Sequence, residues 1–223
     1  MTPLRDFVRR LGARLRPADH RAVFGEIFRR NAWGDGESVS GPGSTRARGA
    51  DLRPDLLALL HELGARKLLD APCGDFNWIE EVADGVPEYV GVDVVPELIE
   101  ANLREHLSPR RSFLCADLTR DPLPPADVIL CRDCLVHFSH RDAWAALENF
   151  RRSGSRYLLT ITFLDRAENA RIRTGEWYPI NLQAAPFRFP PPLALVDERC
   201  THTGGIYRDK RLALWEIASL PSR

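Results

Sequence analysis

The segment Arg66–Phe76, with the sequence RKLLDAPCGDF, decides the fold of this chain of 223 residues. Apolar residues lead into Asp70, small residues follow it as far as Gly74, and a helical pattern begins after Phe76. A strand, a tight turn and a helix in this order bring backbone amides close to a ligand at the start of the helix. We therefore expect the first strand of an α/β domain here, with a binding site at its carboxyl end.

Apolar segments recur along the rest of the chain. We expect strands at 66–71, 88–94, 111–115, 127–132 and 156–162, with helices at 76–84, 96–105 and 139–151. Apolar strands that alternate with helices indicate a parallel sheet covered on both faces. Two later segments, Leu193–Val196 and Leu212–Ile217, are joined by a link without a helical pattern, which predicts an antiparallel pair. The expected α/β fold is a doubly wound, mostly parallel sheet of seven strands that ends in this pair.

The chain begins with a basic segment that has its own pattern. Residues 1–30 carry apolar side chains at helical spacing among many arginines, which predicts an amphipathic helical arm. We expect this arm to pack on the domain or on a second copy of the chain, as in a homodimer. Contact with an anionic membrane or substrate is the alternative for such an arm.

A loop rich in Gly, Ser and Pro follows at residues 34–50. Its central part, Ser40–Ser44, resembles a phosphate-binding loop but lacks the ending of a P-loop. We expect it to fold over the ligand as a lid, although an ordinary linker would have the same composition. A helix is expected at 52–63, with Asp51 as its cap and Gly64 as its end.

Composition narrows the class of protein. We expect the arm and loop at 1–50 to precede one binding domain at 51–223. Lys and Arg number 31, as do Asp and Glu, so a net charge of zero gives no general attraction to nucleic acid. No apolar run reaches the roughly 20 residues that cross a bilayer, and the N-terminus lacks the apolar region of a signal peptide. The five cysteines are expected to be reduced, and the protein to be cytoplasmic, with no integral membrane segment and no nucleic-acid partner.

Three acidic residues fall at or just after expected strand ends, namely Asp70, Asp93 and Asp117, at separations of 23 and 24 residues. An open parallel sheet binds ligands outside the carboxyl ends of its strands, so the three acids would share one site. Asp93 could accept from ribose hydroxyls, and Asp117 from an adenine amino group. Asp70 would hold the turn or contact an amino group of the ligand. A single Asp at such a position more often caps a turn, but three in register favour a site.

These motifs resemble the class I S-adenosylmethionine-dependent methyltransferases over about residues 50–165, and this implies S-adenosylmethionine as the cofactor. By this resemblance, the methionine part of the cofactor would be lined by Asp70, Ala71, Pro72 and Gly74. The ribose and adenine would be held by Asp93, Val94, Asp117 and Leu118. Cys131 would lie beneath the sulfonium. The family's turn has three alternating glycines, whereas here the positions hold Pro72, Gly74 and Phe76. Because Pro72 donates no amide, we expect fewer turn amides at the methionine end, compensated by the Gly41–Ser44 loop.

Three polar residues follow the fourth strand, where the resemblance places the transferred methyl group: Arg132, Asp133 and His137. His137 could take a proton from a hydroxyl or ammonium acceptor, although a structural role is equally open. Asp133 could orient His137 or the substrate, and Arg132 could bind a substrate carboxylate or phosphate.

A zinc site is the alternative use of this turn. Cys131 and Cys134 have metal-ligand spacing, and only Cys200 and His202 could complete four ligands. Since the chain has no second pair of closely spaced cysteines, we expect no metal.

The segment 163–191 is long, aromatic and rich in proline, whereas the family has a helix between its fifth and sixth strands. Long irregular segments in compact domains are often functional. Trp177, Tyr178 and Asn181 could therefore bind a sugar or another flat acceptor. Alternatively, they fill the core beside the missing helix.

The sequence thus predicts a methyltransferase that acts on oxygen or nitrogen of a small-molecule or glycan acceptor. A nicotinamide-dependent oxidoreductase is the first alternative, but it would need a G-x-G-x-x-G turn that residues 70–76 lack. A cofactor-binding protein without catalysis is the second. The sequence does not identify the acceptor or the oligomeric state.

Overall fold

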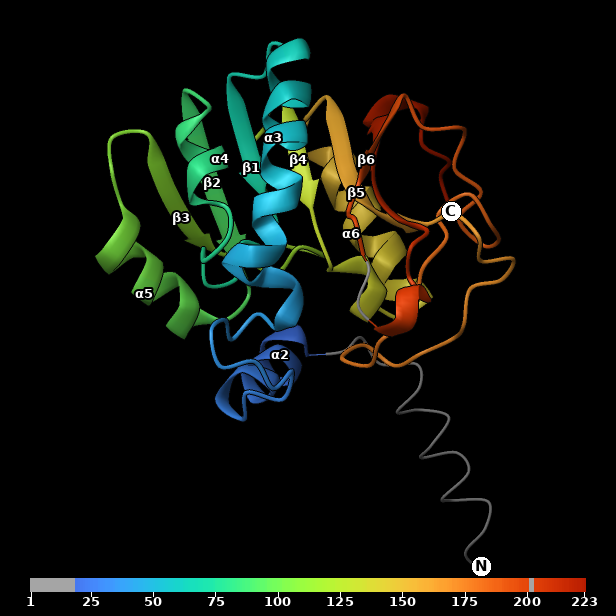
Figure 1. Ribbon diagram of the computed structural model, residues 1–223, viewed down its shortest axis with the longest axis horizontal. Helices are drawn as coiled ribbons and strands as arrows, with labels where there is room; N and C mark the ends of the chain where they lie inside the picture. Colours follow the sequence, from blue (N-terminus) through green and yellow to red (C-terminus); the bar gives the residue numbers. More distant parts are fainter. Residues whose placement is uncertain (1–18, 201–202) are drawn as a thin grey trace, which may run out of the picture.

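The computed structural model describes residues 19–200 and 203–223. Its centre is one sheet of seven strands in the order β3-β2-β1-β4-β5-β7-β6 (Figure 1). The strands are β1 (Lys67–Asp70), β2 (Glu88–Asp93), β3 (Arg111–Cys115), β4 (Val128–Cys131), β5 (Tyr157–Phe163), β6 (Ala194–Asp197) and β7 (Lys210–Glu216). The first five run parallel, and β7 lies antiparallel between β5 and β6. The predicted fold class is therefore confirmed, including the antiparallel pair.

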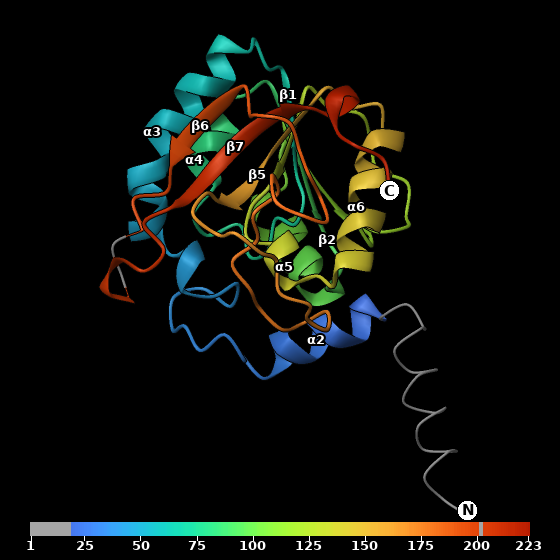
Figure 2. The same cartoon turned by 90° about the vertical axis from the view of Figure 1, so that its right-hand side faces the viewer.

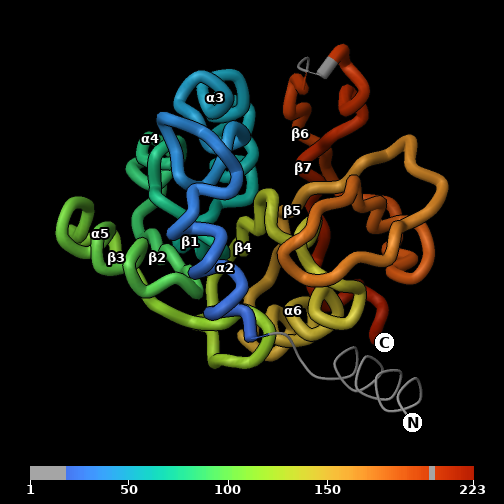
Figure 3. Tube along the Cα trace, turned by 90° about the horizontal axis from the view of Figure 1, so that it is seen from below, coloured from blue at the N-terminus to red at the C-terminus, as the bar shows by residue number. Residues whose placement is uncertain are grey.

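Helices cover both faces of this sheet and one of its ends. The α-helices of the described residues are α2 (His20–Arg29), α3 (Arg46–Glu62), α4 (Glu80–Asp84), α5 (Pro96–His106) and α6 (His140–Arg152). α3 and α4 lie on one face and α6 on the other (Figures 2 and 3). β5 is buried along its whole length, because it carries apolar side chains toward both layers. α2 lies across the end of the sheet at which the parallel strands finish (Figure 1), where the expected site lies.

The helix expected at 52–63 begins earlier than the sequence indicated. α3 starts at Arg46, and the hydroxyl of Thr45, rather than Asp51, accepts from the amide of Arg48 at 3.4 Å. Gly49 and Pro54 weaken the helical signal of the first turns. Gly49 is required there by packing, since an added Cβ would lie 2.9 Å from Cβ of Trp78.

The helix expected from residue 76 begins later. Phe76 has a φ of 58°, in the left-handed region, so no helix can start at this residue. α4 therefore contains only Glu80–Asp84. Phe76 is 1% exposed and packs edge-on against Tyr89 and Phe113, filling the space that a glycine at this position would leave.

The connection between β5 and β6 contains no helix and no regular strand in its described residues. Asn169 holds it together: its side-chain amide donates to the carbonyl oxygens of Asn181 and Ala185, both at 2.8 Å, and its oxygen accepts from the amide of Asn181. Residues 1–18 of the expected arm lie outside the described residues. The boundary at residue 50 falls within α3, and the division into arm and domain stays a prediction. Among the described helices, none has the length and apolar character needed to cross a membrane.

Candidate active site

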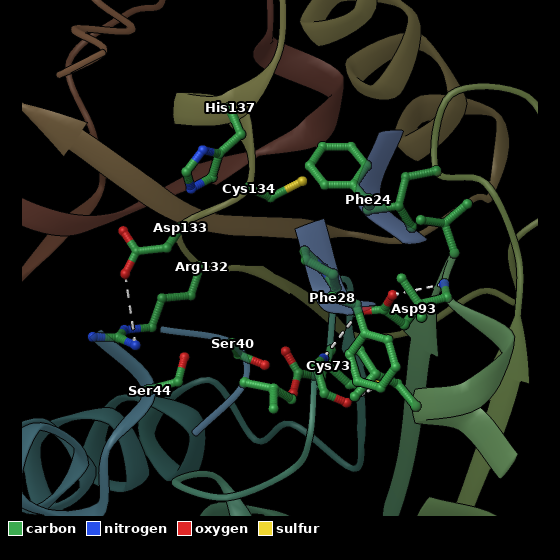
Figure 4. A pocket seen from close by; sticks show the side chains of 18 of the residues that line it. Phe24, Phe28, Ser40, Ser44, Cys73, Asp93, Arg132, Asp133, Cys134 and His137 are labelled. Carbon is green, nitrogen blue, oxygen red and sulfur yellow. Dashed lines mark hydrogen bonds and ion pairs between the residues drawn. The ribbon is translucent and has the colours of Figure 1, made fainter. Parts of the chain in front are cut away.

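A pocket lies at the carboxyl ends of the parallel strands and holds about 980 Å³ of empty space, its open mouth included (Figure 4). Its floor comes from the strand ends, and α2, the loop before α3 and the turn after β4 close it from above. Of the residues predicted to form the site, the pocket is lined by Asp70, Pro72, Gly74, Asp93, Val94, Asp117, Leu118, Arg132, Asp133 and His137. The structure thus brings together residues from four different strand ends.

Asp70, at the end of β1, is paired with a residue that the sequence did not single out. The hydroxyl of Tyr89 donates to Oδ2 of Asp70 at 2.6 Å, and both side chains are buried. The parallel register sets Tyr89 opposite Leu68 in the neighbouring strand. Burial raises the pKa of Asp70 to about 7, and the Tyr89 hydrogen bond opposes this rise. Asp70 therefore changes charge close to neutral pH.

Asp93, at the end of β2, fixes the turn after β1. Its two oxygens accept from the amides of Gly74 at 3.1 Å and Val95 at 3.0 Å. Burial raises the pKa of Asp93 to about 6, although these backbone hydrogen bonds favour the charged form. A carboxylate has about four acceptor positions, so Asp93 keeps capacity for two hydroxyl donors.

Asp117, which follows β3, is already engaged. Thr119 donates to Oδ1 through its amide and its hydroxyl, while Oδ2 accepts from Nδ1 of His20 at 2.9 Å and pairs with Arg120 at 3.1 Å. His20 comes from α2 and also lies 3.4 Å from a carboxylate oxygen of Asp142. The carboxylate of Asp117 is therefore saturated by protein donors, and its predicted contact with adenine stays a prediction.

The loop before α3 is docked on the turn after β1. Asp75 accepts from the hydroxyl of Ser38 at 2.8 Å, the amide of Val39 at 3.0 Å and the hydroxyl of Ser40 at 3.2 Å. Ser40 in turn accepts from the amide of Asp75. We call residues 38–44 the lid loop, since Val39, Ser40 and Ser44 line the pocket. The local sequence gives no signal for this role of Asp75, because an Asp after Gly is typical of an ordinary turn.

His137 faces the pocket from the turn after β4 (Figure 4). Its Nδ1 lies 3.0 Å from the carbonyl oxygen of Glu176, so Nδ1 carries a proton and Nε2 of the neutral ring has a free lone pair. The indole of Trp33 lies against the ring at 5.0 Å between centroids. Burial lowers the pKa of His137 below its ordinary 6.5, which favours the neutral form.

Arg132 and Asp133 belong to a group of four charges in which Arg132, Glu198 and Lys210 are buried and Asp133 is partly exposed. Nε and Nη2 of Arg132 donate to the two oxygens of Glu198 at 2.8 and 2.7 Å. Asp133 accepts from Nζ of Lys210 at 2.7 Å. Burial alone would raise the pKa of Asp133, but Lys210 and Arg132 hold it at about 2. Glu198 and Lys210 belong to the β6–β7 region, and nothing in the local sequence linked them to β4.

The remaining predicted residues lie outside the pocket lining. Ala71, in the turn after β1, and Cys131, at the end of β4, are fully buried. Tyr178 is buried against His140, Asn181 is bonded within its own segment, and Trp177 packs on Phe163 and Tyr207. The burial of Tyr178 matches the alternative in which it fills the core, whereas Trp177 is 42% exposed, and substrate contact by the three stays a prediction.

The segment around Trp177 nevertheless supports the site indirectly. The amide of Gly175 donates to the carbonyl oxygen of His137, and that of Tyr178 to Val136. Together with the Glu176 carbonyl, these bonds hold the turn that carries His137. Within the described residues, no cluster of His, Cys, Asp or Glu could hold a metal ion, and the five cysteines form no disulfide.

The polar groups of the pocket fit S-adenosylmethionine. Asp93 suits a ribose, apolar Val94, Leu98 and Leu118 suit a flat base, and Asp70 suits an ammonium group. Gly74 allows the turn after β1 to lie close against the lid loop, because an added Cβ would overlap the hydroxyl of Ser40. The fit rests on this donor and acceptor set.

A comparison with known protein families finds a methyltransferase domain within the chain. Residues 68–154 match the family model described as a methyltransferase domain. No curated protein sequence matches the chain.

Solved structures share the fold at low sequence identity. The N-methyltransferase NodS from Bradyrhizobium japonicum WM9 is 14% identical, with a TM-score of 0.52 over 74% of this chain and 96% of that one. Magnesium protoporphyrin IX methyltransferase from Synechocystis PCC 6803 with bound S-adenosylmethionine is 17% identical, with a TM-score of 0.50 over 70% and 81%. The methyltransferase domain of bacterial CtHen1 is 19% identical, with a TM-score of 0.46 over 52% of this chain; the match spans 66% of that domain, just under two thirds. The strand order is that of the class I methyltransferase fold, and residues 68–154 within it match a methyltransferase domain.

Proposed function

We propose that the protein methylates an oxygen or nitrogen atom of a small-molecule or glycan acceptor, and that His137 is the general base that takes up the acceptor's proton. The observation that carries this proposal is the position of His137. It lines the pocket, its tautomer is fixed by the Glu176 carbonyl oxygen, and its second ring nitrogen is available to accept a proton.

The chemistry divides between cofactor and protein. Bound S-adenosylmethionine supplies an electrophilic methyl group. The protein must hold that group in line with the attacking atom and take up the proton that a hydroxyl or ammonium acceptor loses. The lowered pKa of His137 keeps its imidazole neutral and ready to accept at neutral pH. Trp33 beside it offers a flat apolar wall to the acceptor.

Cofactor residues keep the roles implied by the resemblance. Asp93 would bind the ribose hydroxyls, Val94 and Leu118 would flank the adenine, and Asp70 would face the ammonium group. The amide of Gly74 is bonded to Asp93, which fixes the turn in one conformation. This pre-organisation reduces the entropy lost on binding.

Arg132 and Asp133 act by position in this proposal. Three N–H groups of Arg132 donate to Glu198 and to the carbonyl oxygen of Gly43, so its charge is largely satisfied within the protein. Asp133 is likewise held by Lys210. The pair would therefore shape the acceptor side of the pocket. A homodimer through the arm and a cytoplasmic location remain part of the proposal.

The test combines binding with transfer. Calorimetry with S-adenosylhomocysteine and with NAD should show binding of the former alone. Labelled S-adenosylmethionine is then offered with panels of hydroxyl, amine and glycan acceptors. With an accepted compound, His137→Asn should bind S-adenosylhomocysteine normally and lose methyl transfer by about 10²- to 10⁴-fold. The matched control is His61→Asn, on the exposed side of α3, which should keep the wild-type rate.

Two results would contradict the proposal. Binding of NAD without S-adenosylhomocysteine would remove the methyltransferase assignment. An undiminished rate in His137→Asn would refute the role of His137 as a base while leaving the enzyme class intact.

A further inference from the structure

The order of the strands gives a bound cofactor a direction. Asp117 follows β3, Asp93 ends β2, Asp70 ends β1 and Arg132 follows β4, in the spatial order of the sheet. With adenine at the β3 side and ribose at Asp93, the amino-acid end must extend over β1 toward β4. This direction rests on the proposed placement of the ribose.

The lid loop covers that end of the pocket. Besides its bonds to Asp75, it is held by Nη1 of Arg132, which donates to the carbonyl oxygen of Gly43 at 2.8 Å. The side-chain amide of Asn77 donates to the carbonyl oxygen of Ser44 at 3.0 Å. The loop is thus fixed along its length and forms a wall of the pocket (Figure 4).

The three serines of this loop differ in what their hydroxyls do. Those of Ser38 and Ser40 are both bonded to Asp75. The hydroxyl of Ser44 makes no hydrogen bond to any residue that the structure describes, and Ser44 lines the pocket. It is the one donor of the loop's side chains that is left for a ligand.

Arg132 donates to the lid loop, but its charge is already paired with Glu198 and the carboxylate of Asp133 also lies against Gly43, so the donor offered to an anionic group is the hydroxyl of Ser44. The guanidinium of Arg132 lies next to the loop through its bond to Gly43, and it stacks on Trp78 at 4.6 Å from the ring centroid. Asp70 supplies a negative group at the end of β1. A zwitterionic amino acid would find a partner for its ammonium group at Asp70 and for its carboxylate at the lid loop.

We propose that the hydroxyl of Ser44 donates to the carboxylate of the cofactor's methionine part, so that the lid loop replaces the turn amide that Pro72 cannot provide. Ser44 thereby becomes a binding residue, whereas Ser38, Ser40 and Asp75 position it. The loop would distinguish ligands with an amino-acid end from those without one.

The experiment compares two ligands by calorimetry. S-adenosylhomocysteine has the amino-acid end, and 5′-methylthioadenosine has the same nucleoside thioether without it. Ser44→Ala should weaken S-adenosylhomocysteine binding by about 10-fold or more, because hydrogen bonds to charged groups are strong, and leave methylthioadenosine unchanged. Ser44→Thr, which keeps a hydroxyl, should largely restore affinity. The control Ser219→Ala, an exposed position bonded to Glu216, should alter neither.

Each other outcome counts against the proposal. Unchanged S-adenosylhomocysteine affinity in Ser44→Ala, or an equal loss for both ligands, would overturn the carboxylate contact. A wild-type protein that binds methylthioadenosine and S-adenosylhomocysteine equally would also overturn it. Failure of the wild type to bind S-adenosylhomocysteine at all would instead contradict the cofactor placement, and the inference with it.

Discussion

Nδ1 of His20 lies 2.9 Å from Oδ2 of Asp117, although 97 residues separate the two along the chain. The other ring nitrogen of His20 lies 3.4 Å from Asp142, and the ring stacks on Phe138 at 5.4 Å. Burial disfavours the imidazolium, but the hydrogen bond to Asp117 and the negative charge of Asp142 outweigh it and raise the pKa of His20 to about 9. A positive charge between two carboxylates therefore ties α2 to the end of β3 and to α6.

We expect stability to depend on this histidine at alkaline pH. Because the pKa of His20 in the folded protein is above its ordinary 6.5, its contribution is complete below pH 6.5 and is lost as pH rises through 9. The free energy of unfolding of the wild type, measured in urea, should exceed that of His20→Gln by roughly 3 kcal/mol more at pH 6 than at pH 10. His61→Gln on the exposed side of α3 serves as control. A difference between wild type and His20→Gln that does not change with pH would show that the ion pairs contribute nothing.

Tyr89 should control the pH range of cofactor binding. Tyr89→Phe removes the hydroxyl that stabilises charged Asp70, so the pKa of Asp70 should rise above 7. The affinity for S-adenosylhomocysteine, measured from pH 6 to 9, should fall on the acid side at a pH about one unit higher than in the wild type. Methylthioadenosine, which lacks the ammonium group, should show no such shift. Identical pH profiles for Tyr89→Phe and wild type would exclude this role.

Gly74 and Gly154 provide a matched pair of substitutions. Both have a positive φ, of 54° and 75°, but only at Gly74 would an added Cβ meet another atom, the hydroxyl of Ser40. Gly74→Ala and Gly154→Ala should each lower the free energy of unfolding by about 1–2 kcal/mol through backbone strain. Only Gly74→Ala should also displace the lid loop and weaken S-adenosylhomocysteine binding, by about 10-fold or more. Normal binding by Gly74→Ala would mean that the loop accommodates the methyl group.

Breaking the buried ion pair of Arg132 and Glu198 should lower the free energy of unfolding far more than breaking an exposed ion pair with the same N–O distance. Arg132–Glu198 and Arg199–Asp55 both measure 2.7 Å, but the first is about 5% exposed and the second nearly half exposed. Glu198→Ala leaves a buried guanidinium without its partner and should lower the free energy of unfolding by about 3–5 kcal/mol. Asp55→Ala should cost less than about 1 kcal/mol. Equal losses in urea unfolding would contradict the burial of the first pair.

Element types were predictable from sequence because their signals are local. The apolar runs of β1 to β5 and the spacing of α5 and α6 are periodic patterns within short windows, and their observed bounds agree with expectation to within one or two residues. The start of α3 and the length of α4 were wrong for tertiary reasons. Gly49 is in α3 because Trp78 packs against it, and Phe76 adopts a left-handed backbone while its ring is buried.

The residues of the candidate site show the same difference between local sequence signals and tertiary contacts. Asp70, Asp93, Asp117 and His137 could be located from sequence, since each follows an apolar strand and the ends of parallel strands share one edge. Their partners could not be located. Tyr89 meets Asp70 through the strand register, and His20 reaches Asp117 because α2 crosses the end of the sheet.

The sequence by itself thus determined the sheet and the position of the acids at the strand ends, because short-range patterns encode both. Tertiary structure alone decided the ionisation of those acids and whether they keep an unoccupied hydrogen-bond acceptor position. A pKa and a free hydrogen-bonding position depend on burial and on neighbours that are distant in the chain. For that reason Asp117 is saturated by His20, Arg132 is paired with Glu198, and Ser44 keeps a free hydroxyl at the pocket.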